Sequence, residues 1–277
     1  MSEHVVTFGA QQGLVGTLSI PTDVAPHALA FVLLNAGVIP RMGPHRFNVK
    51  LARALAQQGI SSLRLDLSGQ GDSQPALGNL HYEHQAQADL RAAMDEVTAH
   101  TGITRFVIAG ICSGAVTGLA VARKDPRVVG LWMLDGHAYA TWRSTLWRIA
   151  RQLRYQFSGT VRTWLARLLD QFRPQSAVAP HPQIDYGVRS LSRAEFAQAL
   201  QNLVDRGVQV YLVYTLDKLW SYSYGGQFRD TFKRHAFVDE VICEHRPDMD
   251  HTLTKLSAQQ EVISQIAAWA RQIPMAH

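Results

Sequence analysis

The sequence GICSG at residues 110–114 places a thiol between two glycines, a spacing that suits nucleophilic catalysis. An apolar run precedes it and a helical pattern follows, so Cys112 is predicted at the centre of a sharp strand-to-helix turn. Glycine at both ends keeps Cβ atoms out of that turn, and the helix N-terminus lowers the pKa of the thiol. Cys112 is the predicted nucleophile. Ser113, off the centre, is the weaker candidate, and a small buried cysteine in a glycine-rich turn is the non-catalytic alternative.

A histidine and a carboxylate that follow later strand-like runs could activate this thiol. His251 lies in the loop RPDMDHTLT, and Asp217 comes directly after the run VQVYLVY. The nucleophile, the acid and the histidine then follow one another along the chain in the order that accompanies such a nucleophile turn. A Cys–His–Asp triad acts in the same way as a Ser–His–Asp triad. We expect His251 to withdraw the thiol proton and Asp217 to orient its ring. Asp135 is the alternative acid, and His245 is the alternative base.

Main-chain N–H groups should stabilise the negative oxygen that forms when the thiol attacks a carbonyl. The N–H of Ser113 is positioned for this by the turn. A second donor is expected in the loop after the strand ALAFVLL, and we assign it to Val38, with Gly37 allowing close approach. Two such donors can each lower the barrier by roughly 3 kcal/mol.

The segment between residues 137 and 205 interrupts the strand pattern with helical stripes and is predicted to be a cap over one end of a sheet. We expect three aromatic side chains to contact an acyl substrate: Trp142 in this cap, and Trp220 and Tyr222 after the predicted acid. Packing of these side chains against the core is the alternative. Ser192 and Glu195 form a predicted capping box.

The cap is strongly basic. Between residues 137 and 173 it holds one acid, Asp170, and seven arginines, at positions 143, 148, 151, 154, 162, 167 and 173, whereas the whole chain carries only +5. Such a surface could receive an acidic acyl-carrier protein or an anionic membrane, or could simply be a solvated helix face. Zinc-finger and phosphate-loop spacings are absent, so a nucleic-acid partner is not expected.

Elsewhere, short apolar runs alternate with helical patterns, which is typical of βαβ units and a parallel sheet. We expect strands at residues 28–34, 62–67, 105–109, 128–134, 208–214 and 238–244, helices at 47–58 and 84–100, a final helix capped by Ser257 and Gln260, and an N-terminal hairpin at one edge. The core should comprise residues 1–136 and 206–277, with the cap at 137–205.

The composition fits a single globular unit. The chain has 277 residues, 47% of them hydrophobic and 18% charged, which excludes a disordered protein. Two cysteines cannot build a disulfide framework, and the N-terminus lacks the features of a signal peptide, so a cytoplasmic location is expected. Neither a metal nor an organic cofactor is expected.

The sequence resembles the α/β-hydrolase superfamily. The stretch RFNVKLARALAQQGISSLRLDLSGQGDS is similar to the serine aminopeptidase and lysophospholipase-like branch, and NAGVIPRMGPHR and DHTLT are closer to hydrolases associated with exosortase gene clusters. The resemblance implies an α/β fold with a mostly parallel eight-stranded sheet, flanking helices and a helical cap, and acyl transfer without a cofactor. Cys112 departs from the usual serine, as in dienelactone hydrolases and polyhydroxyalkanoate synthases, and Asn35-Ala36-Gly37 departs from the usual His-Gly.

Three functions follow as hypotheses. The first is hydrolysis of an ester or thioester of a small-molecule substrate through a Cys112 thioester. The second is transfer of the acyl group to an alcohol, amine or thiol, which a dry site would favour because a thioester tolerates water and reacts with amines and thiols. The third is a catalytically silent binding protein.

Overall fold

The computed structural model describes residues 1–34, 36–147, 150, 190–218 and 221–274. Within these ranges, eight strands form one sheet in the order β1-β2-β4-β3-β5-β6-β7-β8. The first two strands form the predicted antiparallel hairpin at one edge, and the other six are parallel to one another. The strands are β1 (Ser2–Phe8), β2 (Leu14–Ile20), β3 (Ala30–Leu33), β4 (Ser61–Asp66), β5 (Phe106–Ile111), β6 (Val128–Leu134), β7 (Gln209–Thr215) and β8 (Ile242–Arg246). The predicted eight-stranded, mostly parallel sheet is confirmed.

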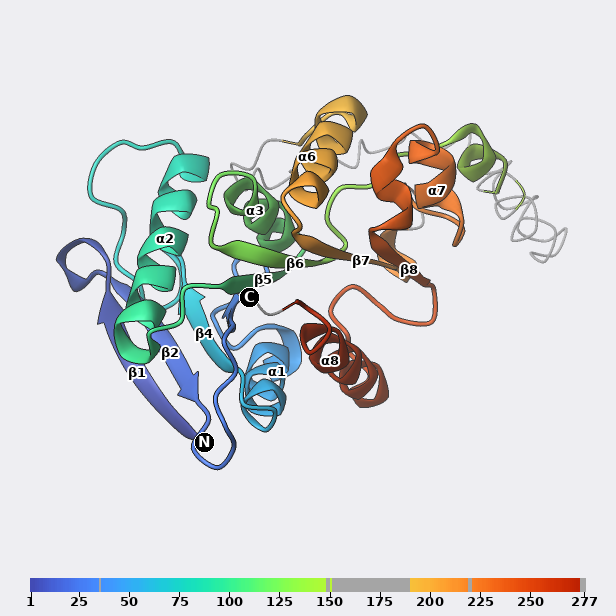
Figure 1. Ribbon diagram of the computed structural model, residues 1–277. Helices are drawn as coiled ribbons and strands as arrows, with labels where there is room; N and C mark the ends of the chain where they lie inside the picture. Colours follow the sequence, from blue (N-terminus) through green and yellow to red (C-terminus); the bar gives the residue numbers. More distant parts are fainter. Residues whose placement is uncertain (35, 148–149, 151–189, 219–220, 275–277) are drawn as a thin grey trace, which may run out of the picture.

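Helices cover both faces of this sheet, as Figure 1 shows. Helices α1 and α8 lie on one face, and α2, α3 and α6 lie on the other. The helices are α1 (Phe47–Ala56), α2 (Tyr82–Thr101), α3 (Ser113–Ala122), α6 (Arg193–Asp205), α7 (Gln227–Phe232) and α8 (Leu256–Ala270), with short 3-10 turns at η1 (Ala10–Gln12), η2 (Pro44–Arg46), η3 (Leu216–Lys218) and η4 (Ala236–Asp239). Among the described residues, none of the helices combines the length and apolar composition that a membrane span needs.

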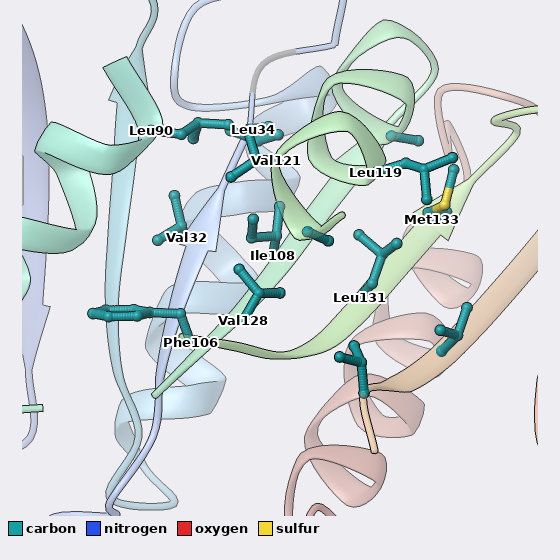
Figure 2. Packing of buried hydrophobic residues seen from close by; sticks show 14 of the residues in the cluster. Val32, Leu34, Leu90, Phe106, Ile108, Leu119, Val121, Val128, Leu131 and Met133 are labelled. Carbon is teal, nitrogen blue, oxygen red and sulfur yellow. The ribbon is translucent and has the colours of Figure 1, made fainter. Parts of the chain in front are cut away.

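The parallel strands are apolar on both faces because helices pack on both sides. Successive side chains of a strand point to opposite faces. In β5, Phe106 and Ile108 accordingly join the cluster under α2 and α3, whereas Val107 joins the cluster under α1 and α8. Figure 2 shows the first cluster, in which Ile108 and Leu131 of neighbouring strands lie beneath α3. This packing fixes the register of the strands, and therefore the positions of their carboxyl ends.

Two local predictions near the chain's end were wrong. The expected strand at 238–244 is displaced, because residues 236–239 form the 3-10 turn η4 and Phe237 is buried in the core under α6. The capping box of Ser257 and Gln260 does not form, since α8 starts at Leu256 and Ser257 already lies inside the helix. The capping box of Ser192 and Glu195 on α6 is confirmed, with both hydrogen bonds present.

Helix α6 ends the segment predicted as a cap, and it packs on the sheet. Phe196, Leu200 and Leu203 are fully buried in the same cluster as the side chains of β7. Residues 142–147, near the start of the segment, are helical. Most of the predicted cap, residues 148–149 and 151–189, lies outside the described residues.

The burial of α6 can be tested with Phe196→Ala. Loss of a fully buried phenylalanine should lower the free energy of unfolding by about 3–5 kcal/mol. Gln198→Ala on the exposed face of the same helix is the matched control and should change it by less than about 0.5 kcal/mol. Guanidinium unfolding curves measure both. A separate, early transition in the Phe196→Ala curve would show instead that α6 folds independently of the sheet.

Candidate active site

Cys112 occupies the strained turn that its neighbours predict. It lies between β5 and α3 with φ 57° and ψ −117°, a left-handed backbone conformation that is uncommon for a residue with a side chain. The turn is so tight that a Cβ atom on Gly110 would lie 2.4 Å from the carbonyl carbon of Gly114. The Cys112 N–H donates to the Leu134 carbonyl at 2.8 Å, which ties the turn to β6. The thiol is therefore half-buried at the carboxyl edge of the sheet.

His251 lies in the loop between β8 and α8 and hydrogen-bonds to the Cys112 sulfur. This bond is the largest influence on the thiol and lowers the pKa of Cys112; burial opposes it, while the charge of Lys218 and the Ser113 N–H assist it. Hydrogen bonds to Asp135 and Cys112 raise the pKa of His251 to about 10, against the effect of burial. The two shifts favour a thiolate beside an imidazolium.

Asp135 is the carboxylate that contacts the ring. Its Oδ2 lies 2.8 Å from His251 Nδ1, and its side chain is fully buried. The N–H of Thr215 donates to Asp135 Oδ1 at 2.8 Å, and the Thr215 hydroxyl donates to Oδ2. Since Nδ1 is engaged by Asp135, Nε2 is the ring nitrogen left for the sulfur.

The structure corrects the expected position of Asp217, which does not contact the ring. Its carboxylate instead accepts the main-chain N–H of His251 at 2.6 Å. The strand register explains the difference. Ile111 pairs with Leu134 across β5 and β6, so Asp135 follows directly beside Cys112, whereas Asp217 lies beyond β7 in the 3-10 turn η3. Asp217 therefore anchors the loop that carries the histidine.

The loop after β3 approaches the turn at Gly37. The Gly37 N–H donates to the Ser113 hydroxyl oxygen at 2.9 Å, and Gly37 itself has φ 59°. Val38, the expected second oxyanion donor, is a residue that is 73% exposed, and its role stays a prediction. The N–H that contacts the turn is that of Gly37. The Ser113 N–H contacts the Cys112 sulfur, in agreement with the first expected donor.

An ion pair that the sequence reasoning missed holds this loop in place. The Arg41 N–H donates to Asp66 Oδ1 at 2.6 Å, and its guanidinium contacts both Asp66 and Asp72. Asp66 is completely buried at the end of β4 and also accepts the main-chain N–H of Asp72 in the following turn. The signal available in the sequence was an arginine, Arg41, in the loop after one strand and an aspartate, Asp66, at the end of the next.

Of the three aromatic residues expected to contact substrate, Tyr222 is in the core. Its ring is 2% exposed, stacks on Tyr214 at 3.9 Å between ring centroids, and its hydroxyl lies 3.4 Å from the Cys243 sulfur. Trp142 is 73% exposed and lines a surface depression with Thr141 and Tyr224. Trp220 lies outside the described residues.

Most of the arginines that make the predicted cap basic also lie outside the described residues. Arg143 is described, and it pairs with Asp230 at 2.9 Å while its guanidinium lies over the ring of Tyr224. The other six arginines, from Arg148 to Arg173, are not. In the part of the chain that the structure describes, no group of three potential ligand side chains could hold a metal ion.

Comparison with known proteins assigns the family. A family model described as serine aminopeptidase S33 matches residues 28–221. The chain belongs to this family of α/β-hydrolases. No curated protein matches the sequence.

Solved structures share the fold across the whole chain. An α/β serine hydrolase without a lid from Xanthomonas campestris is 15% identical, with a TM-score of 0.57, and the match covers 100% of this chain and 96% of the other. The proline iminopeptidase of Mycobacterium smegmatis is 19% identical, with a TM-score of 0.56 and 98% of each chain covered. A Pyrococcus furiosus esterase is 13% identical, with a TM-score of 0.62, 98% of this chain and 91% of the esterase being covered. At these identities the likeness concerns the fold.

The ionisation of the thiol can be tested with iodoacetamide. Because the contact with His251 lowers the pKa of Cys112, the thiol should ionise and react with iodoacetamide below the ordinary thiol pKa of about 8.5. Protonation of the sulfur should slow the reaction only below its lowered pKa. Mass spectrometry of the labelled peptide as a function of pH measures the rate.

Cys243 is the internal control. Burial raises its pKa to about 12, so it should be labelled far more slowly, and Cys243→Ser should leave the fast phase unchanged. A Cys112 profile that rises only through about pH 8.5 would contradict the ion pair.

Proposed function

We propose that the chain is a cysteine-dependent hydrolase that cleaves an ester or thioester through an acyl-enzyme on Cys112. The observation that carries the proposal is the continuous contact from the Cys112 sulfur through the His251 ring to the buried Asp135 carboxylate. A thiolate held beside an imidazolium at the carboxyl edge of the sheet is the arrangement of a nucleophile and its acid–base partner. The fold and family of the chain are consistent with this chemistry.

In the first step the Cys112 sulfur attacks the carbonyl carbon of the substrate and forms a C–S bond. The electrons of the carbonyl π bond move to its oxygen, which becomes an oxyanion near the Ser113 N–H. When that oxyanion collapses, the bond to the leaving alkoxide or thiolate breaks. His251 gives its Nε2 proton to this leaving group, and a Cys112 thioester remains.

In the second step a water molecule attacks the thioester while neutral His251 takes one of its protons. Collapse of the second oxyanion breaks the C–S bond, releases a carboxylic acid, and restores the thiolate and imidazolium. An amine, alcohol or thiol in the position of the water would give acyl transfer by the same proton movements. Water is the acceptor that the hydrolase family favours.

Asp135 and Asp217 have different tasks in this mechanism. Asp135 accepts from Nδ1, keeps Nε2 directed at the sulfur, and stabilises the imidazolium. Asp217 holds the main chain of the histidine loop through the His251 N–H. The ring and its backbone are thus fixed by two separate carboxylates.

Intact-mass spectrometry with a panel of p-nitrophenyl esters and acyl thioesters tests the function. The wild-type protein should gain the mass of one acyl group, located on Cys112, and Cys112→Ala should gain none and lose turnover. Cys243→Ser, which removes the other thiol, should behave as the wild type because that sulfur is buried and protonated.

The same experiment separates the alternatives. Acyl-enzyme that decays at the same rate with and without added amines or thiols indicates hydrolysis, whereas decay only in their presence indicates an acyltransferase. Absence of acylation across the panel, with an unreactive Cys112, would contradict the proposal and favour a binding protein.

Substitution of the two carboxylates distinguishes their roles. Asp135→Asn should lower kcat by about 10²–10⁴-fold, because the amide favours the wrong tautomer of His251, as in the best-studied protease triad. Asp217→Asn keeps an acceptor for the His251 N–H and should have a much smaller effect. Steady-state kinetics with one ester measures both, and a larger loss in Asp217→Asn would reverse the assignment.

A further inference from the structure

Ser113, the residue after the proposed nucleophile, carries a hydroxyl that contacts the loop after β3. Ser113 begins α3, and its own N–H contacts the Cys112 sulfur. Its side chain is half-buried, as is Cys112, so both are open to a substrate. The hydroxyl oxygen accepts the Gly37 N–H at 2.9 Å.

This contact changes how the loop after β3 can act. In the structure the Gly37 N–H points at the Ser113 oxygen and is not available to a substrate carbonyl. A hydroxyl has two lone pairs and one hydrogen, so accepting from Gly37 leaves its own hydrogen free to donate. Among the described residues, no acceptor for this hydrogen is found.

We propose that the Ser113 hydroxyl is itself an oxyanion donor, a catalytic side chain that connects the Gly37 N–H to the reacting carbonyl oxygen. The inference rests on the proposed function of Cys112. In the tetrahedral intermediate, the Ser113 N–H and O–H both donate to the oxyanion, and Gly37 donates to the Ser113 oxygen. No proton is transferred along this chain; the hydrogen bonds only shorten as the negative charge develops.

Two physical effects favour this arrangement. A hydroxyl that already accepts a hydrogen bond is a stronger donor, because the two bonds polarise each other. The donor is also held in place before the reaction, since Gly37 belongs to a loop that Arg41 and Asp66 hold against the end of β4. Preorganised donors of this kind stabilise a developing charge without rearrangement.

The opposite role is a gate, in which the hydroxyl must rotate away before Gly37 can bind the carbonyl oxygen. The two roles predict changes of opposite sign. Removing a donor slows acylation, whereas removing a gate frees the Gly37 N–H and accelerates it.

Ser113→Ala therefore tests the proposal. Pre-steady-state acylation by a p-nitrophenyl ester should slow by about 10²-fold, as when one oxyanion donor is removed from a protease, with little change in KM. A trifluoromethyl ketone, which forms a tetrahedral adduct with the thiol, should bind more weakly by a similar factor. Ser113→Thr keeps the hydroxyl and should recover most of the acylation rate.

The rate of alkylation of Cys112 by iodoacetamide would change if Ser113→Ala only disturbed the structure of the turn. Displacement of iodide creates no oxyanion, so Ser113→Ala should alkylate Cys112 at the wild-type rate. Ser257→Ala, an exposed serine in the first turn of α8, is the matched control and should leave every rate unchanged.

The outcomes separate this inference from the proposed function. Unchanged or faster acylation in Ser113→Ala, with normal alkylation, overturns the donor role alone. Alkylation and acylation that fall together also overturn it, since the serine then supports the turn and not the oxyanion. Failure of the wild-type Cys112 to be acylated by any ester or thioester would instead overturn the proposed function.

Discussion

The left-handed backbone of Cys112 is the constraint on which the rest of the site depends. A side chain in this conformation is held only when its surroundings over-determine it, and here they do. The close approach of Gly110 to Gly114 fixes the angle between β5 and α3, and the Cys112 N–H is fastened to β6. The sulfur therefore projects beyond the sheet edge, where side chains from other strands can reach it.

Charge balance then links the parts of the site. Asp135 is fully buried, and a buried carboxylate without partners would be costly. It is stabilised by the Thr215 N–H and hydroxyl and by the ring of His251, which is in turn bonded to the Cys112 sulfur. A carboxyl group, an imidazole ring and a thiol are thus in contact in series at this edge of the sheet. The contact with His251 lowers the pKa of the Cys112 thiol, and the contacts with Asp135 and Cys112 raise the pKa of His251.

Loops, and not strands, carry both His251 and Gly37, and one buried and one exposed carboxylate fix them. Asp66 holds the loop after β3 through the Arg41 N–H, and Asp217 holds the histidine loop through its main chain. Such contacts limit the motion of the reacting groups, which lowers the entropy cost of reaching the reactive geometry. A carboxylate that accepts a main-chain N–H thus holds each of the two loops that meet at Cys112.

The sequence by itself determined the fold, the strained turn and the histidine, because alternating apolar runs and the glycines around Cys112 are local signals. It assigned the acid to Asp217 and kept Asp135 as the alternative, since both follow a strand and only the pairing of β5 with β6 places Asp135 beside the thiol. It assigned the second oxyanion donor to the main-chain N–H of Val38, which stays a prediction, and it did not predict the contact of Gly37 with Ser113, which depends on how the loop after β3 folds. Such contacts join residues that are far apart in the chain. Whether they form therefore depends on the packing of the loops and on the register of the strands.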